Sequence, residues 1–108
     1  MPSKTPKKGL PKHFVKFCAK HPRVAKAYEE LGAALTDVGP LDKKAVALAR
    51  LAVAIGAREE GGVHSHTRRA IEAGATPGEI RHVALLSLTT IGFPNAMAAL
   101  SWIDDVLA

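Results

Sequence analysis

The fold is decided by the run Ala45-Val46-Ala47-Leu48-Ala49-Arg50-Leu51-Ala52-Val53-Ala54-Ile55, in which Arg50 is the single charged residue. Alanine and leucine favour the helix, and this run is apolar around nearly its whole circumference. Only a helix surrounded by other helices tolerates such a surface, so we expect a central helix over residues 42–57, capped by Asp42. The run therefore predicts an all-α fold.

Start and stop signals on both sides of this run predict further helices. Pro22 suits a first helical position, and Thr76 with Glu79 forms a capping box before residues 77–91. Gly74 is expected in a left-handed conformation that closes the preceding helix. The expected helices begin near residues 10, 22, 42, 63, 77 and 94. The first of these should turn Phe14, Val15, Phe17 and Cys18 toward the body of the protein.

The length and composition favour one helical domain over residues 10–108, preceded by a flexible basic segment over residues 1–9. The first 26 residues carry eight basic side chains and no acid, whereas the rest carry seven bases and ten acids. A basic leader on a mildly acidic body is typical of a solvated segment, so we expect no nucleic-acid partner. No membrane partner is expected either, because no apolar stretch approaches the length that crosses a bilayer.

Two further features concern association and compartment. The helices over residues 42–57 and 77–91 expose more apolar surface than a chain of 108 residues covers, which favours a closed homo-oligomer. The single cysteine, Cys18, excludes a disulfide within one chain and suits a reducing compartment, so we expect a cytoplasmic protein.

Candidate chemistry lies in the segment from Ala57 to Ala70. Gly61 and Gly62 are expected in a turn whose amides face the positive end of a helix dipole, where an anion can bind, although two glycines alone are more typical of a plain turn. On a regular helix His66 faces inward with Val63 and Thr67, whereas His64 lies on the other edge. The two histidines are about 160° apart and cannot share an ion, so we expect no metal site.

The inward His66 has two interpretations, a hydrogen-bonded core residue or a catalytic group. Arg50 favours the second, because a buried guanidinium needs a carboxylate from Glu59, Glu60, another protomer or a substrate.

From Leu41 to Ile91 the chain resembles the carboxymuconolactone decarboxylase and alkylhydroperoxidase D (AhpD)-like family. The resemblance rests on Leu41-Asp42-x-Lys44, the alanine-rich helix, the turn, His66, Ala73-Gly74-Ala75-Thr76, Glu79-Ile80 and Gly92-x-Pro94. It implies an all-α fold that assembles as a homo-trimer or homo-hexamer.

The redox branch of this family has a glutamate, then a Cys-x-x-Cys pair, then a histidine four residues beyond the second cysteine. Counting back from His66, these positions hold Ala47, Glu59 and Gly62. Thiol peroxidase chemistry needs an attacking and a resolving thiol, so it should not carry over.

The resemblance to the decarboxylase branch implies a lyase acting on a small lactone or carboxylate, with no cofactor. His66 would be the general acid or base, Glu59 or Glu60 would orient it, and Arg50 with the Gly61 and Gly62 amides would hold a carboxylate. We include His64 with the substrate-binding group.

Two alternatives stay open. The chain is a non-catalytic structural or ligand-binding oligomer of the same fold if side chains fill the space around His66 and Arg50. It is a peroxidase that uses Cys18 across a subunit interface if Cys18 is exposed near a histidine.

Overall fold

The computed structural model describes residues 10–107 as six α-helices and one short 3₁₀ helix, and it assigns no strand in that range. The predicted all-α class is therefore confirmed. The chain divides into two compact units, Met1–Asp42 and Lys43–Ala108. The segment predicted to be flexible, residues 1–9, lies outside the described residues, and the single domain over residues 10–108 stays a prediction. No helix within residues 10–107 is long and apolar enough to span a bilayer.

The first unit consists of α1 (Lys12–Lys20) and α2 (Pro22–Asp37). Pro22 occupies the start of α2, as predicted, because its fixed φ and missing amide hydrogen suit that position. Neither helix buries a residue, and Phe14, Val15 and Phe17 are exposed on α1, so the expected placement of these side chains and of Cys18 toward the body of the protein stays a prediction. Two helices alone cannot enclose an apolar face, because each needs a further element to cover it.

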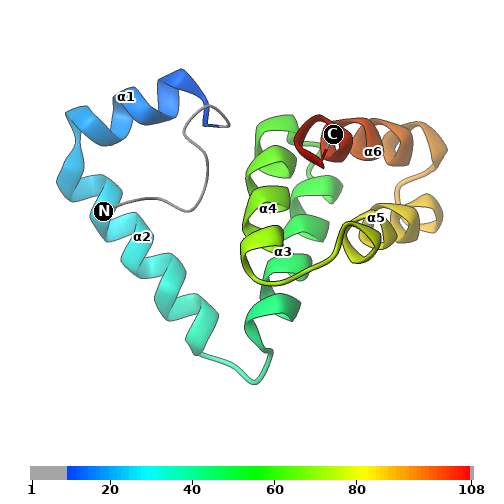
Figure 1. The fold of residues 1–108 in the computed structure, drawn as a ribbon, viewed down its shortest axis with the longest axis horizontal. Helices are drawn as coiled ribbons and strands as arrows, with labels where there is room; N and C mark the ends of the chain where they lie inside the picture. Colours follow the sequence, from blue (N-terminus) through cyan, green and yellow to red (C-terminus); the bar gives the residue numbers. More distant parts are fainter. Residues whose placement is uncertain (1–9, 108) are drawn as a thin grey trace. The chain divides into compact units, whose positions relative to one another are not determined.

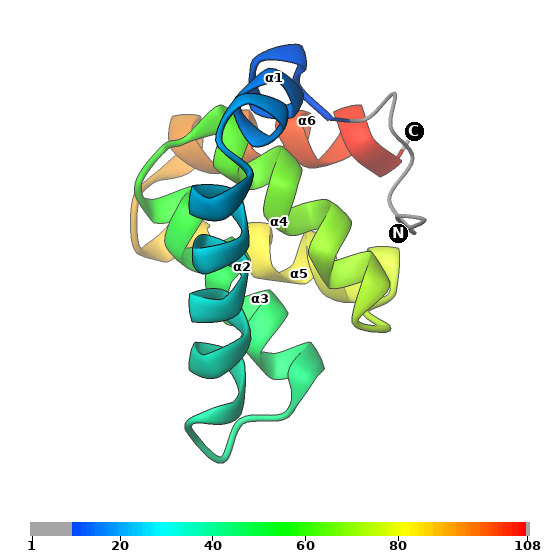
Figure 2. The same cartoon turned by 90° about the vertical axis from the view of Figure 1, so that its left-hand side faces the viewer.

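The second unit holds α3 (Lys43–Gly56), α4 (Glu60–Glu72), α5 (Pro77–Leu86), η2 (Ser87–Thr89) and α6 (Phe93–Leu107). In both views α3 and α4 lie side by side, with α5 and α6 packed against the pair (Figures 1 and 2). The largest fully buried side chains of the unit are Leu51, Val63, Thr67, Ile80 and Ile103. These side chains come from α3, α4, α5 and α6, so each of the four helices contributes to one core.

The central helix α3 is buried on one face only. Ala47, Leu51, Ala54 and Ile55 are buried, whereas the side chain of Val53 is 72% exposed. The expectation that other helices surround α3 is therefore not met within the second unit. The small alanines allow α4 to pack closely on the covered face, and the other face keeps its apolar side chains accessible.

The turn between α3 and α4 differs from the prediction. Arg58 has a left-handed backbone with φ of 56°. The amide of Glu59 donates to the carbonyl of Ala54 and that of Arg58 to Ile55, which is the Schellman pattern that closes a helix. The chain has therefore already turned at Arg58, and α4 begins at Glu60, so that Gly61 and Gly62 lie in its first turn.

Gly74 closes α4 with the same bonding pattern and has φ of 95°, as predicted. The capping box that follows is also confirmed. Thr76 Oγ1 accepts from the Glu79 amide at 3.1 Å, and Glu79 Oε1 accepts from the Thr76 amide at 2.9 Å. Lys44 Nζ donates to Glu79 Oε2 at 2.9 Å and so joins the start of α3 to the start of α5.

The predicted end of α5 at residue 91 is wrong, because the helix ends at Leu86 and continues as η2. The Ser87 hydroxyl donates to the Ala84 carbonyl at 2.6 Å, and the Thr90 hydroxyl donates to the Ser87 carbonyl at 3.1 Å. Hydroxyls that bond to nearby carbonyls compete with the helical pattern. Gly92, with φ of 92°, then starts the turn into α6, which begins at Phe93 rather than at Pro94.

We predict that Thr76→Ala lowers the free energy of unfolding by about 1 kcal/mol, because the Glu79 amide loses its acceptor at the start of α5. Urea unfolding followed by circular dichroism measures the change. Thr89→Ala is the control, since its hydroxyl makes only a long exposed bond of 3.4 Å. Equal losses in the two variants would contradict a capping role.

Candidate functional site

The rotation of α4 about its axis determines what its side chains reach. Val63, Thr67 and Ala70 are fully buried, which confirms the predicted inward stripe. The Thr67 hydroxyl donates to the Val63 carbonyl at 2.7 Å, so the one polar side chain among these three has its partner within the helix. This arrangement places His66 beside the core and His64 on the opposite edge of the stripe.

His66 is half-buried, and its Nδ1 is buried without a hydrogen-bond partner. Burial is the largest cause that lowers the pKa of His66 below its ordinary value of 6.5, followed by the charges of Arg69 and Arg50. The imidazole is therefore neutral at pH 7. A buried ring nitrogen without a partner is unfavourable, and a water or a ligand that bonds to it removes that cost.

Two guanidinium groups act on this imidazole. Arg50 is half-buried on α3, Arg69 lies three residues beyond His66 on α4, and both charges contribute to the lowered pKa of His66. The structure thus brings His66 and Arg50 into electrostatic range, as the sequence predicted. The resulting site is a neutral base within a positive field, which favours an anion over a cation as ligand.

The two predicted carboxylates, Glu59 and Glu60, lie in different surroundings. Glu59 is the exposed N-cap of α4, and its carbonyl accepts from the Val63 amide at 2.8 Å. Glu60 Oε2 lies 4.0 Å from Nε2 of His64, on the other edge of the helix from His66. The structure therefore brings Glu60 to His64.

The two glycines differ in their surroundings. A Cβ at Gly62 would lie 3.3 Å from Glu59 Cβ and 3.4 Å from Ala54 Cβ, whereas one at Gly61 would meet nothing within 4 Å. Gly62 therefore allows the first turn of α4 to approach α3 closely. An anion held by the amides of Gly61 and Gly62 stays a prediction.

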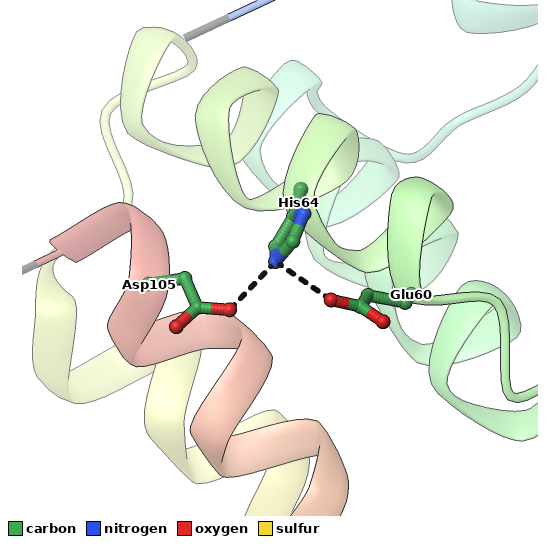
Figure 3. Close-up of side chains that lie close together, drawn as sticks. All are labelled: Glu60, His64 and Asp105. Atoms are coloured by element: carbon green, nitrogen blue, oxygen red, sulfur yellow. Dashed lines mark hydrogen bonds and ion pairs between the residues drawn. The ribbon is translucent and has the colours of Figure 1, made fainter. Parts of the chain in front are cut away.

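His64 has a partner that sequence reasoning missed. Its Nε2 lies 3.0 Å from Asp105 Oδ2 of α6, while Glu60, one helical turn before His64, lies on the same side of the ring (Figure 3). Asp105 is 41 residues away in the chain, and no local pattern signals such a contact. The signal available was limited to helical spacing, which places Glu60 and Arg68 one turn away on either side of His64.

Cys18 and an apolar hollow belong to the first unit. Cys18 is a free, half-buried cysteine on α1, whereas the peroxidase alternative expected an exposed one. An open apolar hollow on the same helix is lined by Leu10, Lys12, Val15, Lys16 and Ala19. None of these five is a predicted site residue.

Comparisons with known proteins agree with this fold. The model of the carboxymuconolactone decarboxylase family matches residues 22–105. Among solved structures, a carboxymuconolactone decarboxylase family protein from Legionella pneumophila superposes with a TM-score of 0.70, at 24% sequence identity. The match covers 89% of this chain and 88% of that protein. A comparison with curated protein sequences found no match.

The lowered pKa of His66 predicts a pH dependence of stability. The unfolded state binds a proton near pH 6.5 and the folded state only at lower pH, so stability falls as the pH drops from 6.5 through the folded pKa. We expect His66→Gln to reduce this loss. Urea unfolding at about pH 8 and about pH 5 measures it. Exposed His82→Gln is the control, and an unchanged pH dependence in His66→Gln would contradict the burial of the neutral ring.

Proposed function

Because the chain belongs to the carboxymuconolactone decarboxylase family, we propose that it binds a small carboxylate or lactone at His66 and acts on it as a lyase, without thiol redox chemistry or a cofactor. The observation that carries the proposal is the unpartnered, buried Nδ1 of His66 within the field of Arg50 and Arg69. A carboxylate of the ligand is attracted by the two guanidinium charges, and a polar atom of the ligand bonds to the ring nitrogen.

In the proposed reaction Arg50 holds a carboxylate of the substrate near the imidazole. The bound negative charge raises the pKa of His66, since it offsets the nearby guanidinium charges that lower it. The ring then takes up a proton and acts as a general acid. As the carbon–carbon bond to the departing carboxylate breaks, its electron pair moves toward the lactone carbonyl, and carbon receives the proton from His66. Carbon dioxide leaves, and His66 returns to its neutral form.

Some of the remaining predicted residues have supporting roles in the proposal. Glu59 orients the substrate or the imidazole from the N-cap of α4, and the amides of Gly61 and Gly62 add positive potential at the first turn. Glu60 and His64 are left out of this proposal, because both lie on the other edge of the helix from His66. The supporting roles are secondary, because the charges that act on His66 come first from Arg69 and then from Arg50.

Peroxidase activity is disfavoured because the sequence has one cysteine and the reaction needs two thiols. The single cysteine is also the reason for proposing a cytoplasmic location. The second candidate is a non-catalytic ligand-binding oligomer. It is favoured by the lack of a pair of thiols in the sequence, and it would use the same anion site. The two differ in one measurable property, the release of carbon dioxide.

A homo-oligomer is part of the proposal. Val53 on α3 is 72% exposed, and Leu85 and Leu86 on α5 are 48% and 60% exposed, all within the second unit. Apolar side chains gathered on two helices of one unit favour burial against identical copies, as a trimer or hexamer.

We predict that small lactones and carboxylic acids raise the melting temperature, because a ligand that binds only the folded state stabilises it. For any compound that is also turned over, His66→Gln should lower kcat by about 100-fold or more while binding persists. Arg50→Ala should weaken binding by about 10-fold to 100-fold through loss of a charge-assisted hydrogen bond.

His82→Gln is the matched control for both measurements, because His82 is exposed on α5. Full activity of His66→Gln would remove the catalytic role. Binding without carbon dioxide release by the unaltered protein would favour the ligand-binding candidate.

A second prediction concerns assembly. Leu86→Glu should shift the protein toward smaller species in sedimentation velocity, because a charge cannot be buried without a partner. Ser101→Glu, on an exposed position of α6, is the control. An unaltered protein that sediments as a monomer would contradict the oligomer.

A further inference from the structure

We propose that Glu60, His64 and Asp105 form a Zn²⁺ site that joins α4 to α6. The three side chains converge on one point from two helices, and Figure 3 shows both carboxylates directed at the same ring nitrogen of His64. The site is separate from the His66 group, because His64 lies on the opposite edge of the buried stripe of α4. Sequence spacing alone predicted no metal here, since it considered only the pair His64 and His66.

The distances between the donor atoms suit a small tetrahedral cation. His64 Nε2 lies 3.0 Å from Asp105 Oδ2 and 4.0 Å from Glu60 Oε2, and the three donor atoms all lie within 4.8 Å of one another. Ligands of tetrahedral Zn²⁺, at about 2.0–2.1 Å from the ion, are separated by about 3.3 Å. The observed separations bracket this value, so small rotations of the side chains complete the site.

A single hydrogen bond from His64 engages only one of the two carboxylates. In the tautomer that carries a hydrogen on Nε2, this nitrogen donates one strong hydrogen bond, here toward Asp105 Oδ2 at 3.0 Å. Glu60 faces the same nitrogen at 4.0 Å, beyond hydrogen-bond length. Two carboxylates close to one nitrogen repel each other, and a dication that binds all three donors converts this repulsion into attraction.

The backbone positions of the donors are fixed by the core. Val63, next to His64, and Ile103, two residues before Asp105, are both fully buried. Glu60 and His64 lie one helical turn apart, which brings their side chains to one face. Since α4 and α6 already pack together, Zn²⁺ binding orders only three side chains and not the backbone.

The donor set also indicates the class of cation. One imidazole nitrogen and two carboxylate oxygens suit Zn²⁺ better than Mg²⁺, which prefers oxygen donors and retains its water. The side chains of Glu60 and Asp105 are 59% and 57% exposed, so the fourth position is open to water. The site therefore has the open form with three protein donors and one solvent ligand.

The test is isothermal titration of the full, untagged chain with Zn²⁺ at neutral pH, carried out in a Cys18→Ser background to remove the thiol. We expect one Zn²⁺ per chain and a melting temperature about 5 °C higher at saturation. Asp105→Asn and His64→Ala should each weaken binding by at least about 10-fold. Mg²⁺ at the same concentration should leave the melting temperature unchanged.

The matched control variants change residues that are next to the proposed ligands in the sequence. Asp104→Asn removes a neighbouring carboxylate that accepts from Arg81 instead, and Glu59→Gln is the control for Glu60→Gln. Binding that is equally weak in Asp104→Asn and Asp105→Asn would overturn the site, as would no binding by the unaltered chain. Circular dichroism of each variant checks the fold. If His64→Ala unfolds, Asp105→Asn and Glu60→Gln still test the site, because both replace an exposed carboxylate by an amide of similar size. Loss of the His66 activity leaves this result untouched, because no ligand is shared.

Discussion

The close packing of α3 against the first turn of α4 is the constraint on which the second unit depends. It comes with a sharp turn at Arg58, an extended N-cap at Glu59 and a glycine at position 62, where a Cβ would make a tight contact. Once these conditions are met, the backbone direction of α4 is fixed by the burial of Val63, Thr67 and Ala70. A left-handed Arg58 is a cost that the packing of the two helices offsets, because residues other than glycine rarely adopt that conformation.

The same constraint produces two chemically different edges on α4. The edge that carries His66 faces the positive field of Arg50 and Arg69, and its imidazole is held neutral. The edge that carries His64 meets two carboxylates, one from its own helix and one from α6. Two histidines separated by one residue therefore favour opposite ligands, an anion at one edge and a cation at the other. A rotation of the helix by one residue would destroy both arrangements together.

Sequence reasoning succeeded where the determining interactions are local. The start of α2 at Pro22, the left-handed Gly74 and the capping box of Thr76 and Glu79 all involve residues within a few positions of one another. It failed where tertiary packing selects the outcome. Arg58 carries no signal for a left-handed turn, whereas the glycines after it suggested a later one. The end of α5 depends on hydroxyl bonds that compete with the helix, and the Asp105 contact depends on how α6 crosses α4.

The positions at which the redox branch has cysteines lie at the same contact between α3 and the first turn of α4. The resemblance to the redox branch would place cysteines at positions 59 and 62, where this chain has a glutamate and a glycine. A Cβ at position 62 would lie 3.3 Å from Glu59 Cβ, which is tighter than about nine in ten such contacts, and 3.4 Å from Ala54 Cβ, at the limit of ordinary van der Waals contact. A cysteine there requires the N-cap residue to shift by a few tenths of an ångström. Side chains in a close-packed interior transmit small changes in volume, so a larger residue at position 62 acts on the spacing of α3 and α4. The glycine found there permits the close approach that also sets the rotation of α4, and with it the edges on which His64 and His66 lie.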